Sequence, residues 1–558
     1  MSTVLRPFLL ALGAYSFLVA RFWFVNDDAY IAFRYSRNLA AGDGLCFNPG
    51  TVPPVEGFTS FLWVLLGTVF ELLPLDIAVG VPVVSALCGA GLLALVMHRL
   101  VHRLGVAPPL AAVGGLLMAT FPPYALWATG GLETMAFALA MFWAFDRLIL
   151  APRPGAWGGL SLLVLSMLRF EGVAWSGGLL FLAALRHRAD LRVLVPAVTV
   201  FTVTYAGYTG WRWATFGEWM PNSVRAKTGS TWDPAGWSRG TAYLMTHVLT
   251  FLTPVLAAAG AVRALVRRRP HAFAVASTAA AFPLFALLST GDFMPMGRLL
   301  VAGIPFQIIL TVWLLEGLAT RRAVLGTAVL ATIALQLLPA WNIHVVPREV
   351  RDRYEFRRAW RGHPNLTEYD FWKLGQRDAT LAWAVDAKIL ERYVQSVPEA
   401  ERPRSVVVSP AGTYGYFTTL KLYDRAGLVT PAVLDRDEPY DISTRSPGHD
   451  RVAPLGFFAD LEPDLLQTSI VHDTNPTLVQ KRCLSQKRAL QSVRDADDLD
   501  RRYFIDFVDV STEGAPAVLV LWRRIDGDAD AAWAGFDARM DSLTTEVRRA
   551  AAAPRDRS

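Results

Sequence analysis

Cysteine and charge are both scarce in this chain, and each shortage excludes a class of protein. Three cysteines among 558 residues form no CxxC pair and no metal-ligand spacing, which argues against a disulfide scaffold. Charged residues make up 18% of the chain, whereas roughly 25% is typical of soluble proteins. Apolar residues make up 53%, which excludes an intrinsically disordered or collagen-like chain.

The shortage of charge is confined to the first part of the chain. Residues 1–340 contain 37 charged residues, or 11%, whereas residues 341–558 contain 65, or 30%. We therefore predict a membrane-embedded catalytic domain over 1–340 and a soluble domain over 341–558. The net charge of +6 comes from short basic loops between apolar runs, so it gives no reason to expect a nucleic-acid partner.

Eleven apolar runs are candidates for membrane spans, which need about 20 apolar residues each. They lie near residues 5–25, 78–98, 108–128, 131–149, 156–169, 172–186, 192–212, 241–266, 271–290, 298–318 and 322–340. A twelfth run, 58–75, is interrupted near its end by Glu71 and Pro74.

The charges of the loops predict how these runs are oriented, because Lys and Arg stay on the cytoplasmic side. Five basic clusters, within 99–103, 147–153, 186–192, 263–269 and 321–322, fall on one side only if residues 58–75 do not cross. This predicts eleven spans in a bacterial cytoplasmic membrane, with the N-terminus inside and the C-terminal domain outside. We expect residues 58–75 to form a helix that lies in the outer interface or re-enters it briefly.

Most of the acidic residues of the membrane part lie in segments predicted to face outward, and Asp27 and Asp28 stand out among them. Adjacent carboxylates repel each other, which raises the pKa of one of them and suits a general base or a metal ligand. The alternative is that they cap a helix N-terminus. At helical spacing Tyr30, Arg34 and Arg37 share one face, where the guanidiniums can bind an anion.

Cations on the outer face are exceptions to the rule that Lys and Arg stay on the cytoplasmic side, so they require an explanation. Arg225, Lys227 and Arg298 are three such residues. Binding an anionic headgroup is the simplest reason, and attraction to ordinary anionic lipid is the alternative. The same segments carry further polar residues that are candidates for a site, namely Glu56, Glu133, Glu171, Asn222 and Asp292.

The ordered set of outward segments resembles a known family. The segments are NDDAYIAFRYSRNLAAGDGLCFNPG, PVEGFTSFLW, GGLETMAFAL, RFEG, FGEWMPNSVRAKTG and GDFMPMGRLLVAGIPF. Together they resemble the GT-C superfamily of membrane glycosyltransferases, in particular the branch of the terminal β-(1→2)-arabinofuranosyltransferases (AftB). The resemblance implies a GT-C-like fold with interfacial helices after the first span.

The resemblance also implies a reaction. An inverting transferase would move a sugar, arabinofuranose being one candidate, from a polyprenyl-phosphate donor to a glycan, lipid or protein acceptor of the cell envelope. Asp27 or Asp28 would act as the base, and the first of the two corresponds to the usual position. We assign Lys227, Arg298 and Arg34, with Tyr30 beside them, to the donor phosphate.

The remaining candidates and the cofactor follow from the same reaction. Glu56, Glu133, Glu171, Asn222 and Asp292 would orient the hydroxyls of the sugar. No cofactor follows from these residues with certainty, and a divalent metal held by Asp27 and Asp28 stays open, although the outer loops of the membrane part contain no His. Two other functions also stay open, a secondary transporter and a non-catalytic membrane protein for envelope assembly or carbohydrate binding.

The C-terminal domain is predicted to be a compact α/β or α+β module. Strand-like runs at 405–409, 469–472, 503–510 and 517–522 accompany helical stretches at 378–395 and 536–552. An aromatic cluster, made up of Tyr414, Tyr416, Phe417 and Tyr423, suits either acceptor-sugar stacking or core packing. Cys46 and Cys483 both face outward in this topology, so a disulfide between them is open.

Overall fold

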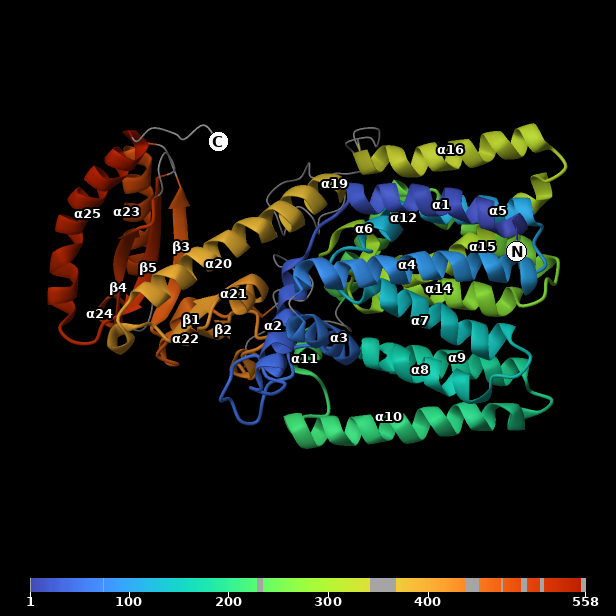
Figure 1. Ribbon diagram of the computed structural model, residues 1–558, viewed down its shortest axis with the longest axis horizontal. Coiled ribbons are helices and arrows are strands. Elements are labelled where there is room, and N and C mark those ends of the chain that lie inside the picture. Colours follow the sequence, from blue (N-terminus) through green and yellow to red (C-terminus); the bar gives the residue numbers. More distant parts are fainter. Residues whose placement is uncertain are drawn as a thin grey trace.

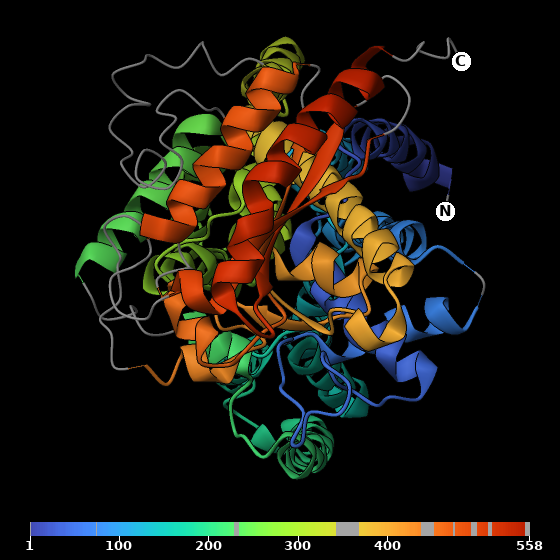
Figure 2. The ribbon, with the colours of Figure 1, turned by 90° about the vertical axis from the view of Figure 1, so that its left-hand side faces the viewer.

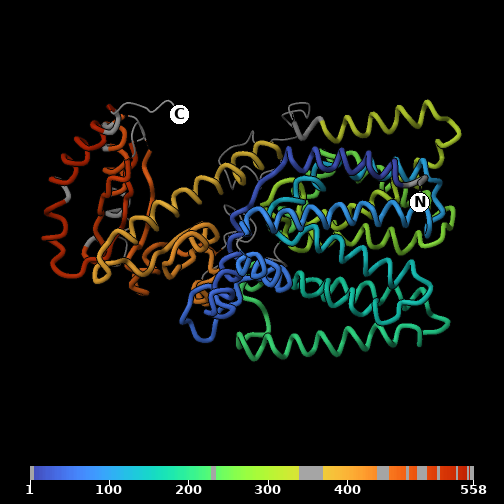
Figure 3. Tube along the Cα trace, in the orientation of Figure 1, coloured from blue at the N-terminus to red at the C-terminus, as the bar shows by residue number. Residues whose placement is uncertain are grey.

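The computed structural model describes residues 2–73, 75–227, 234–341, 368–436, 451–472, 475–492, 499–511 and 516–552. A helical body (residues 2–341) occupies one end of an elongated molecule, and a sheet domain (residues 368–552) occupies the other (Figure 1). The trace in Figure 3 shows the long helices of the body running side by side. The predicted domain boundary at 340/341 borders residues 342–367, which lie outside the described residues.

Helices coincide with the apolar runs of the sequence, and most of them are shorter than the predicted spans. The helices of the body are α1 (Ser2–Arg21), α2 (Asp27–Ala41), α3 (Phe61–Leu72), α4 (Ile77–His102), α5 (Pro108–Ala119), α6 (Pro122–Leu126), α7 (Thr134–Phe145), α8 (Gly155–Leu168), α9 (Gly172–Arg186), α10 (Val195–Phe216), α11 (Asn222–Lys227), α12 (Pro234–Thr250), α13 (Thr253–Val266), α14 (Ala272–Leu288), α15 (Ile304–Leu315) and α16 (Arg322–Trp341). A 3₁₀ segment, η3 (Pro295–Gly303), leads into α15.

Two predicted spans are not single helices. The run 108–128 breaks between α5 and α6, where Pro122 and Pro123 lack the N–H groups that would continue the helix. The run 241–266 bends by 91° between α12 and α13, where Pro254 stands in the first turn of the second helix. In the described part of the chain, three helices are long and apolar enough to span a bilayer, or four if this bent pair is one span.

The predicted non-crossing helix is present as α3, which has only 12 residues and packs against α2. Trp63 anchors it, because the indole Nε1 donates to the carbonyl of Gly131 at 2.8 Å.

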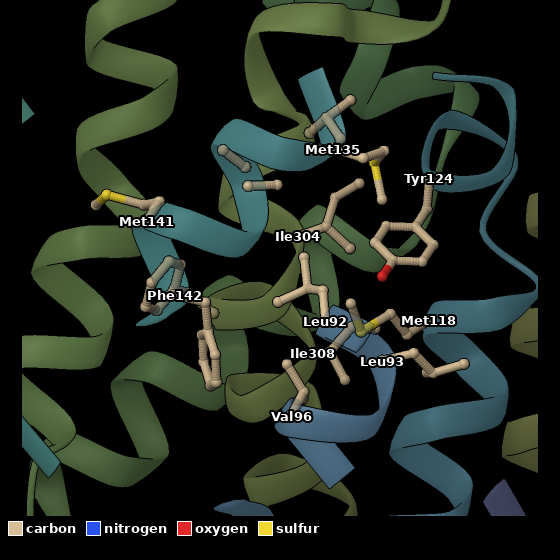
Figure 4. Packing of buried hydrophobic residues seen from close by; sticks show 14 of the residues in the cluster. Leu92, Leu93, Val96, Met118, Tyr124, Met135, Met141, Phe142, Ile304 and Ile308 are labelled. Atoms are coloured by element: carbon tan, nitrogen blue, oxygen red, sulfur yellow. The ribbon is translucent and has the colours of Figure 1, made fainter. Parts of the chain in front are cut away.

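The core of the helical body is built from large apolar side chains that interdigitate between helices. Figure 4 shows Leu92 and Val96 of α4 beside Tyr124, Met135 of α7 and Ile308 of α15. These side chains are at most 1% exposed. The hydroxyl of Tyr124 donates a hydrogen bond to the carbonyl of Gly89 at 2.6 Å. This hydrogen bond offsets the cost of burying a polar group in the core.

The sheet domain contains one five-stranded mixed sheet in the order β2-β1-β3-β5-β4. Its strands are β1 (Ser405–Val408), β2 (Lys421–Asp424), β3 (Leu465–His472), β4 (Tyr503–Asp509) and β5 (Ala517–Arg524). β1 pairs in parallel with β2 and β3, whereas β5 pairs antiparallel with β3 and β4. The sequence analysis missed β2, which has only four residues.

Helices cover both faces of this sheet, as the alternation of its side chains requires. Val407 packs towards α23 (Pro476–Ser492) and α25 (Ala529–Ala552), whereas Val406 and Val408 pack towards α20 (Ala379–Ser396). In Figure 2, α23 and α25 lie in front of the strands, on the side away from the helical body. Cys46 and Cys483 are both buried free thiols, so the disulfide considered between them is not formed.

The helix α2 joins the two parts of the molecule. It packs against α21 (Ala411–Phe417), and Ile31 and Tyr35 share a hydrophobic cluster with strand and helix residues of the sheet domain. Arg34, which is 2% exposed, donates to the carbonyl oxygens of Phe47 (2.5 Å), Gly415 (2.6 Å) and Leu420 (2.9 Å). A buried guanidinium needs such acceptors to offset its desolvation, so Arg34 fastens α2 to the sheet domain.

Candidate active site

A cavity of about 410 Å³ lies beside the N-terminal end of α2. Segments far apart in the sequence line it, including the loop before α3, the turn between α8 and α9, α11 and the segment before η3. Its charged members are Asp28, Glu133, Arg169, Glu171, Lys227, Asp292 and Arg298. Apolar side chains, such as Phe58, Trp63 and Phe293, form much of the remaining wall. A largely apolar cavity with a few convergent charges is typical of a ligand site.

Local sequence explains how Asp28 comes to line this cavity. Asn26 is the N-cap of α2, and its side chain accepts a hydrogen bond from the backbone N–H of Asp28 at 2.8 Å. Asp28 therefore lies in the first helical turn, where the partial positive charge of the helix terminus favours a carboxylate. The alternative that Asp27 or Asp28 caps the helix is wrong, because Asn26 takes the cap position.

Asp27 faces the other way and meets the sheet domain. Its carboxylate accepts hydrogen bonds from the N–H of Gly412 (3.2 Å) and from the N–H and hydroxyl of Thr413 (2.8 Å each). Burial against this domain raises the pKa of Asp27 to about 6, although these hydrogen bonds act in the opposite direction. Asp27 does not line the cavity.

Arg298 is held in place beside its neighbouring carboxylate. Its Nε donates to Asp292 Oδ2 at 2.7 Å, and its guanidinium carbon lies 5.8 Å from the centre of the Trp127 ring. Both side chains of the ion pair are largely buried. The chain reaches this geometry through left-handed backbone at Met296 and Gly297, which turns the start of η3.

A second cation, Arg169, lies between two carboxylates. Its Nε is 2.7 Å from Glu171 Oε1 and 3.5 Å from Glu133 Oε1. The arrangement leaves the three side chains with one net negative charge, which suits binding of neutral hydroxyl groups. The sequence analysis did not assign Arg169 to the site, although an arginine in an outward-facing turn was a signal for it.

Lys227 lies at the end of α11 and is exposed, although it also lines the cavity. Within the described residues no carboxylate lies within ion-pair distance of its amine, whereas Arg225 on the same helix pairs with Asp435 at 2.8 Å. Lys227 is therefore a cation at the cavity that no described acidic side chain neutralises.

The cavity brings together six of the eleven predicted site residues and leaves five outside. The six are Asp28, Glu133, Glu171, Lys227, Asp292 and Arg298. Asp27, Tyr30, Arg34, Glu56 and Asn222 lie outside it. The assignment of Arg34 to a phosphate does not fit, because its donors are taken by backbone carbonyls and by Asn48 Oδ1.

The other outside residues support the walls of the cavity. Glu56 forms a buried ion pair with Arg212 at 2.7 Å, and Arg212 also donates to the carbonyl of Trp219. Asn222 donates to the carbonyls of Gly427 (2.6 Å) and Leu428 (2.9 Å). These contacts fix the loop before α3 to the segment that carries α11.

Tyr30 has a packing role, because its ring contacts those of Tyr416 (centroids 5.5 Å apart) and Phe417 (5.3 Å). These contacts place part of the predicted aromatic cluster in the joint between α2 and the sheet domain. Tyr416 also donates its hydroxyl to Glu71 Oε1 at 2.7 Å.

The doublet Asp27–Asp28 is not arranged to hold a metal ion between its carboxylates. The oxygens of Asp27 accept from Gly412 and Thr413, whereas Asp28 lines the cavity. Among the described residues, no group of three or more His, Cys, Asp or Glu side chains is placed to bind a metal. We therefore derive no step that uses a metal ion.

Comparisons with known proteins agree with this architecture. The chain is 26% identical over 485 residues to the terminal β-(1→2)-arabinofuranosyltransferase of Corynebacterium glutamicum, covering 75% of this chain and 67% of that protein. No family model matches the chain.

Among solved structures, the chain is similar to ArnT from Cupriavidus metallidurans, in the crystal structure bound to undecaprenyl phosphate and in that of the apo state. Each match has a TM-score of 0.51 and 16% identity, and covers 93% of this chain and 97% of ArnT. At this identity the likeness shows the fold, which is that of a polytopic helical membrane protein with a C-terminal sheet domain.

Proposed function

We propose that this chain, a membrane glycosyltransferase of the GT-C superfamily, transfers a sugar from a polyprenyl-phosphate donor to a hydroxyl group of a cell-envelope acceptor. The observation that carries the proposal is that Asp28, Lys227 and Arg298 line one cavity. Such a reaction needs a proton acceptor and cations on the departing phosphate, and the cavity offers both kinds of group.

In the proposed reaction the acceptor oxygen attacks C1 of the donor sugar, and the bond from C1 to the phosphate oxygen breaks with inversion. Asp28 takes the proton of the attacking hydroxyl, which is typically worth about 10²–10⁴-fold in rate. Lys227 and Arg298 stabilise the negative charge that develops on the lipid phosphate. Asp292 holds Arg298 at 2.7 Å and so limits its freedom to move.

Other charged groups of the cavity suit the sugar and not the phosphate. Glu133 and Glu171 flank Arg169, and their oxygens can accept hydrogen bonds from sugar hydroxyls. The apolar wall formed by Phe58, Trp63 and Phe293 excludes water from the reacting centre. Asp27 then has a supporting role, because it positions the start of α2 against Gly412 and Thr413.

The proposal includes the topology predicted from loop charge. Eleven crossings would place the cavity and the sheet domain on the outer side of a bacterial cytoplasmic membrane, where a lipid-linked donor and an envelope acceptor meet. The bent pair α12–α13 counts as one of these crossings. Variants with a single cysteine at the position of Asp43 or of Arg268 test this topology. When a thiol reagent is added to either side of sealed vesicles, the two cysteines should react from opposite sides.

The reaction is tested with purified protein and a panel of polyprenyl-phosphate sugars. Polyprenyl-phospho-arabinofuranose comes first, because the curated relative is an arabinofuranosyltransferase. Product masses identify the sugar transferred, and NMR of the new linkage reports inversion. Transfer from at least one donor by the wild type, and loss of transfer in Asp28→Asn, is the expected result; transfer that persists in Asp28→Asn would show that the base is another group.

A further inference from the structure

A second cleft, of about 340 Å³, lies in the sheet domain between β1 and β3. The two strands pair at one position, Val406 with Leu465, and the register of β3 is irregular between Leu465 and Gln467. Beyond this irregularity β3 pairs with β5 on its other side. The strands separate at the carboxyl end of β1, and such points in α/β sheets are common ligand sites.

The side chains around this cleft combine aromatic surfaces with hydrogen-bonding groups. Trp383 and Tyr414 contribute the aromatic surfaces, and Trp383 is partly exposed. Asp386, one turn after Trp383 on α20, and Gln467 of β3 contribute polar groups, and Ser409 also lines the cleft. Asp386 has 23% of its side chain exposed and lies 3.8 Å from His472 Nε2.

This combination suits a sugar better than an anion or a lipid chain. The apolar face of a sugar ring packs on an aromatic ring, while its hydroxyls need both donors and acceptors nearby. Asp386 and Arg425 both line the cleft, so it presents charges of both signs, and an uncharged ligand with many hydroxyls can donate to the first and accept from the second. A hydrocarbon chain in the cleft would leave the polar groups around it without hydrogen-bond partners.

The cleft is connected through the chain to the candidate active site. Ser409 and Pro410 line the cleft, and Gly412 and Thr413, a few residues later, bind the carboxylate of Asp27 beside Asp28. A second link runs through the segment after β2, where Arg425 lines the cleft and Leu428 lines the main cavity.

We infer that the cleft is a remote subsite for the acceptor glycan, which holds sugar residues that do not react. This inference rests on the proposed function, because it needs an acceptor whose reacting hydroxyl lies near Asp28. It predicts that long acceptors are used better than short ones. A ligand at the cleft also contacts the segment that positions α2, so binding there orients the acceptor relative to the base.

The kinetic experiment compares acceptors of different lengths in three variants. Trp383→Ala removes an aromatic surface, and Ser469→Phe fills the cleft from β3. Leu381→Ala is the matched control, because Leu381 precedes Trp383 on α20, is 62% exposed and does not line the cleft. Acceptors are arabinofuranose oligomers of two, four and six residues.

Both cleft variants should raise KM for the hexasaccharide about tenfold, leave kcat within about twofold, and leave the disaccharide unaffected. Leu381→Ala should behave as the wild type with every acceptor. An equal loss with all three acceptors would mean that the cleft residues act only on the stability of the domain. Unchanged KM for the hexasaccharide in both variants would also overturn the inference.

A binding measurement separates this inference from the proposed function. Asp28→Asn protein is titrated with hexasaccharides of arabinose, mannose, galactose and glucose, and ligand protons in contact with the protein are detected by saturation-transfer NMR. Binding of at least one hexasaccharide that is lost in Asp28→Asn/Trp383→Ala supports the cleft, even if no donor supports transfer. A glycan subsite would be excluded if none of the four hexasaccharides binds. It would also be excluded if binding persists when either Trp383→Ala or Ser469→Phe is combined with Asp28→Asn.

Discussion

The two neighbouring aspartates at the start of α2 carry the same functional group but have different roles. On the cavity side, Asp28 is one of seven charged side chains around a space large enough for a ligand. On the sheet-domain side, Asp27 accepts three hydrogen bonds from Gly412 and Thr413 and does not line this cavity. Identical neighbouring residues therefore differ because one meets a cavity and the other meets a folded backbone.

This difference shows why a pair of acidic residues is an ambiguous signal in a sequence. A carboxylate whose oxygens are already satisfied by protein donors is a poor proton acceptor for a substrate. A carboxylate that lines a cavity keeps its oxygens available. Four substitutions test this contrast, from the largest expected effect to the smallest.

The most direct test compares the same substitution at the two positions. Asp28→Asn should lower kcat by about 10²–10⁴-fold, because it removes the proposed base and preserves shape. Asp27→Asn should lower kcat by less than about tenfold, because it changes only a supporting contact. Transfer rates at saturating donor and acceptor decide this, and a larger loss in Asp27→Asn would reverse the assignment of the two roles.

The cavity side can be tested further at Lys227, the cation for which the described part of the chain shows no acidic partner. Lys227→Gln should lower kcat by about 10²-fold, since removing one group that stabilises developing charge typically costs that much. Lys227→Arg should recover part of the rate. Arg225→Gln is the matched control on the same helix, because Arg225 pairs with Asp435 and should not affect transfer. Equal losses at both positions would indicate a general effect of charge on α11.

On the sheet-domain side, a substitution at Gly412 should lower the stability of the folded protein. The Cβ of an alanine at Gly412 would overlap the carbonyl oxygen of Asp27. Gly412→Ala should therefore lower the melting temperature by several degrees, which corresponds to about 1–3 kcal/mol. Gly456→Ala is the control, because no atom lies within 4 Å of its added Cβ. A Gly412→Ala protein as stable as this control would show that α2 and α21 do not pack closely in solution.

The smallest expected effect is a change in pH dependence. Asp27 has a pKa of about 6 in the folded protein, against an ordinary value of 3.8. The folded state therefore binds more protons between these values, and stability falls as the pH rises from about 4 to about 6. Asp27→Asn removes this contribution, of about 1–2 kcal/mol after allowance for partial exposure.

Thermal unfolding in detergent between pH 4 and pH 7 measures this contribution. The melting temperature of Asp27→Asn, relative to that of the wild type, should rise across the interval. Asp28→Asn, at the neighbouring position, is the comparison for a general effect of removing a charge. Parallel curves for Asp27→Asn and the wild type would mean that Asp27 titrates at its ordinary value.

Some of these features could be predicted from the sequence because they depend on composition and local charge. Loop arginines predicted a helix over 58–75 that does not cross the membrane; the helix is present as α3 and packs against α2, whereas its orientation in the membrane stays a prediction. Cations that oppose the orientation rule pointed to Arg225, Lys227 and Arg298; the last two line the cavity, whereas Arg225 pairs with Asp435. The cations lie within the segments that they mark, whereas the prediction for residues 58–75 depends on basic clusters spread from Arg99 to Arg322.

Other features depend on contacts between distant segments, and local patterns do not contain them. The acceptors of Arg34 include Gly415 and Leu420, so its structural role was not visible beside Asp28 in the sequence. Glu56 was expected at the site, but its partner Arg212 is 156 residues away. The bend between α12 and α13 was missed because Pro254 lies inside an otherwise continuous apolar run.

The Arg34 contacts also bear on how the protein is made. Gly415 and Leu420 are synthesised 381 and 386 residues after Arg34, so the ribosome has completed most of the chain before this guanidinium can meet its acceptors. Until then the helix that carries Asp28 lacks the contacts that fasten it to the sheet domain. A nascent chain that already contains every charged residue of the cavity, the last of which is Arg298, therefore still lacks this joint, which forms late in biosynthesis.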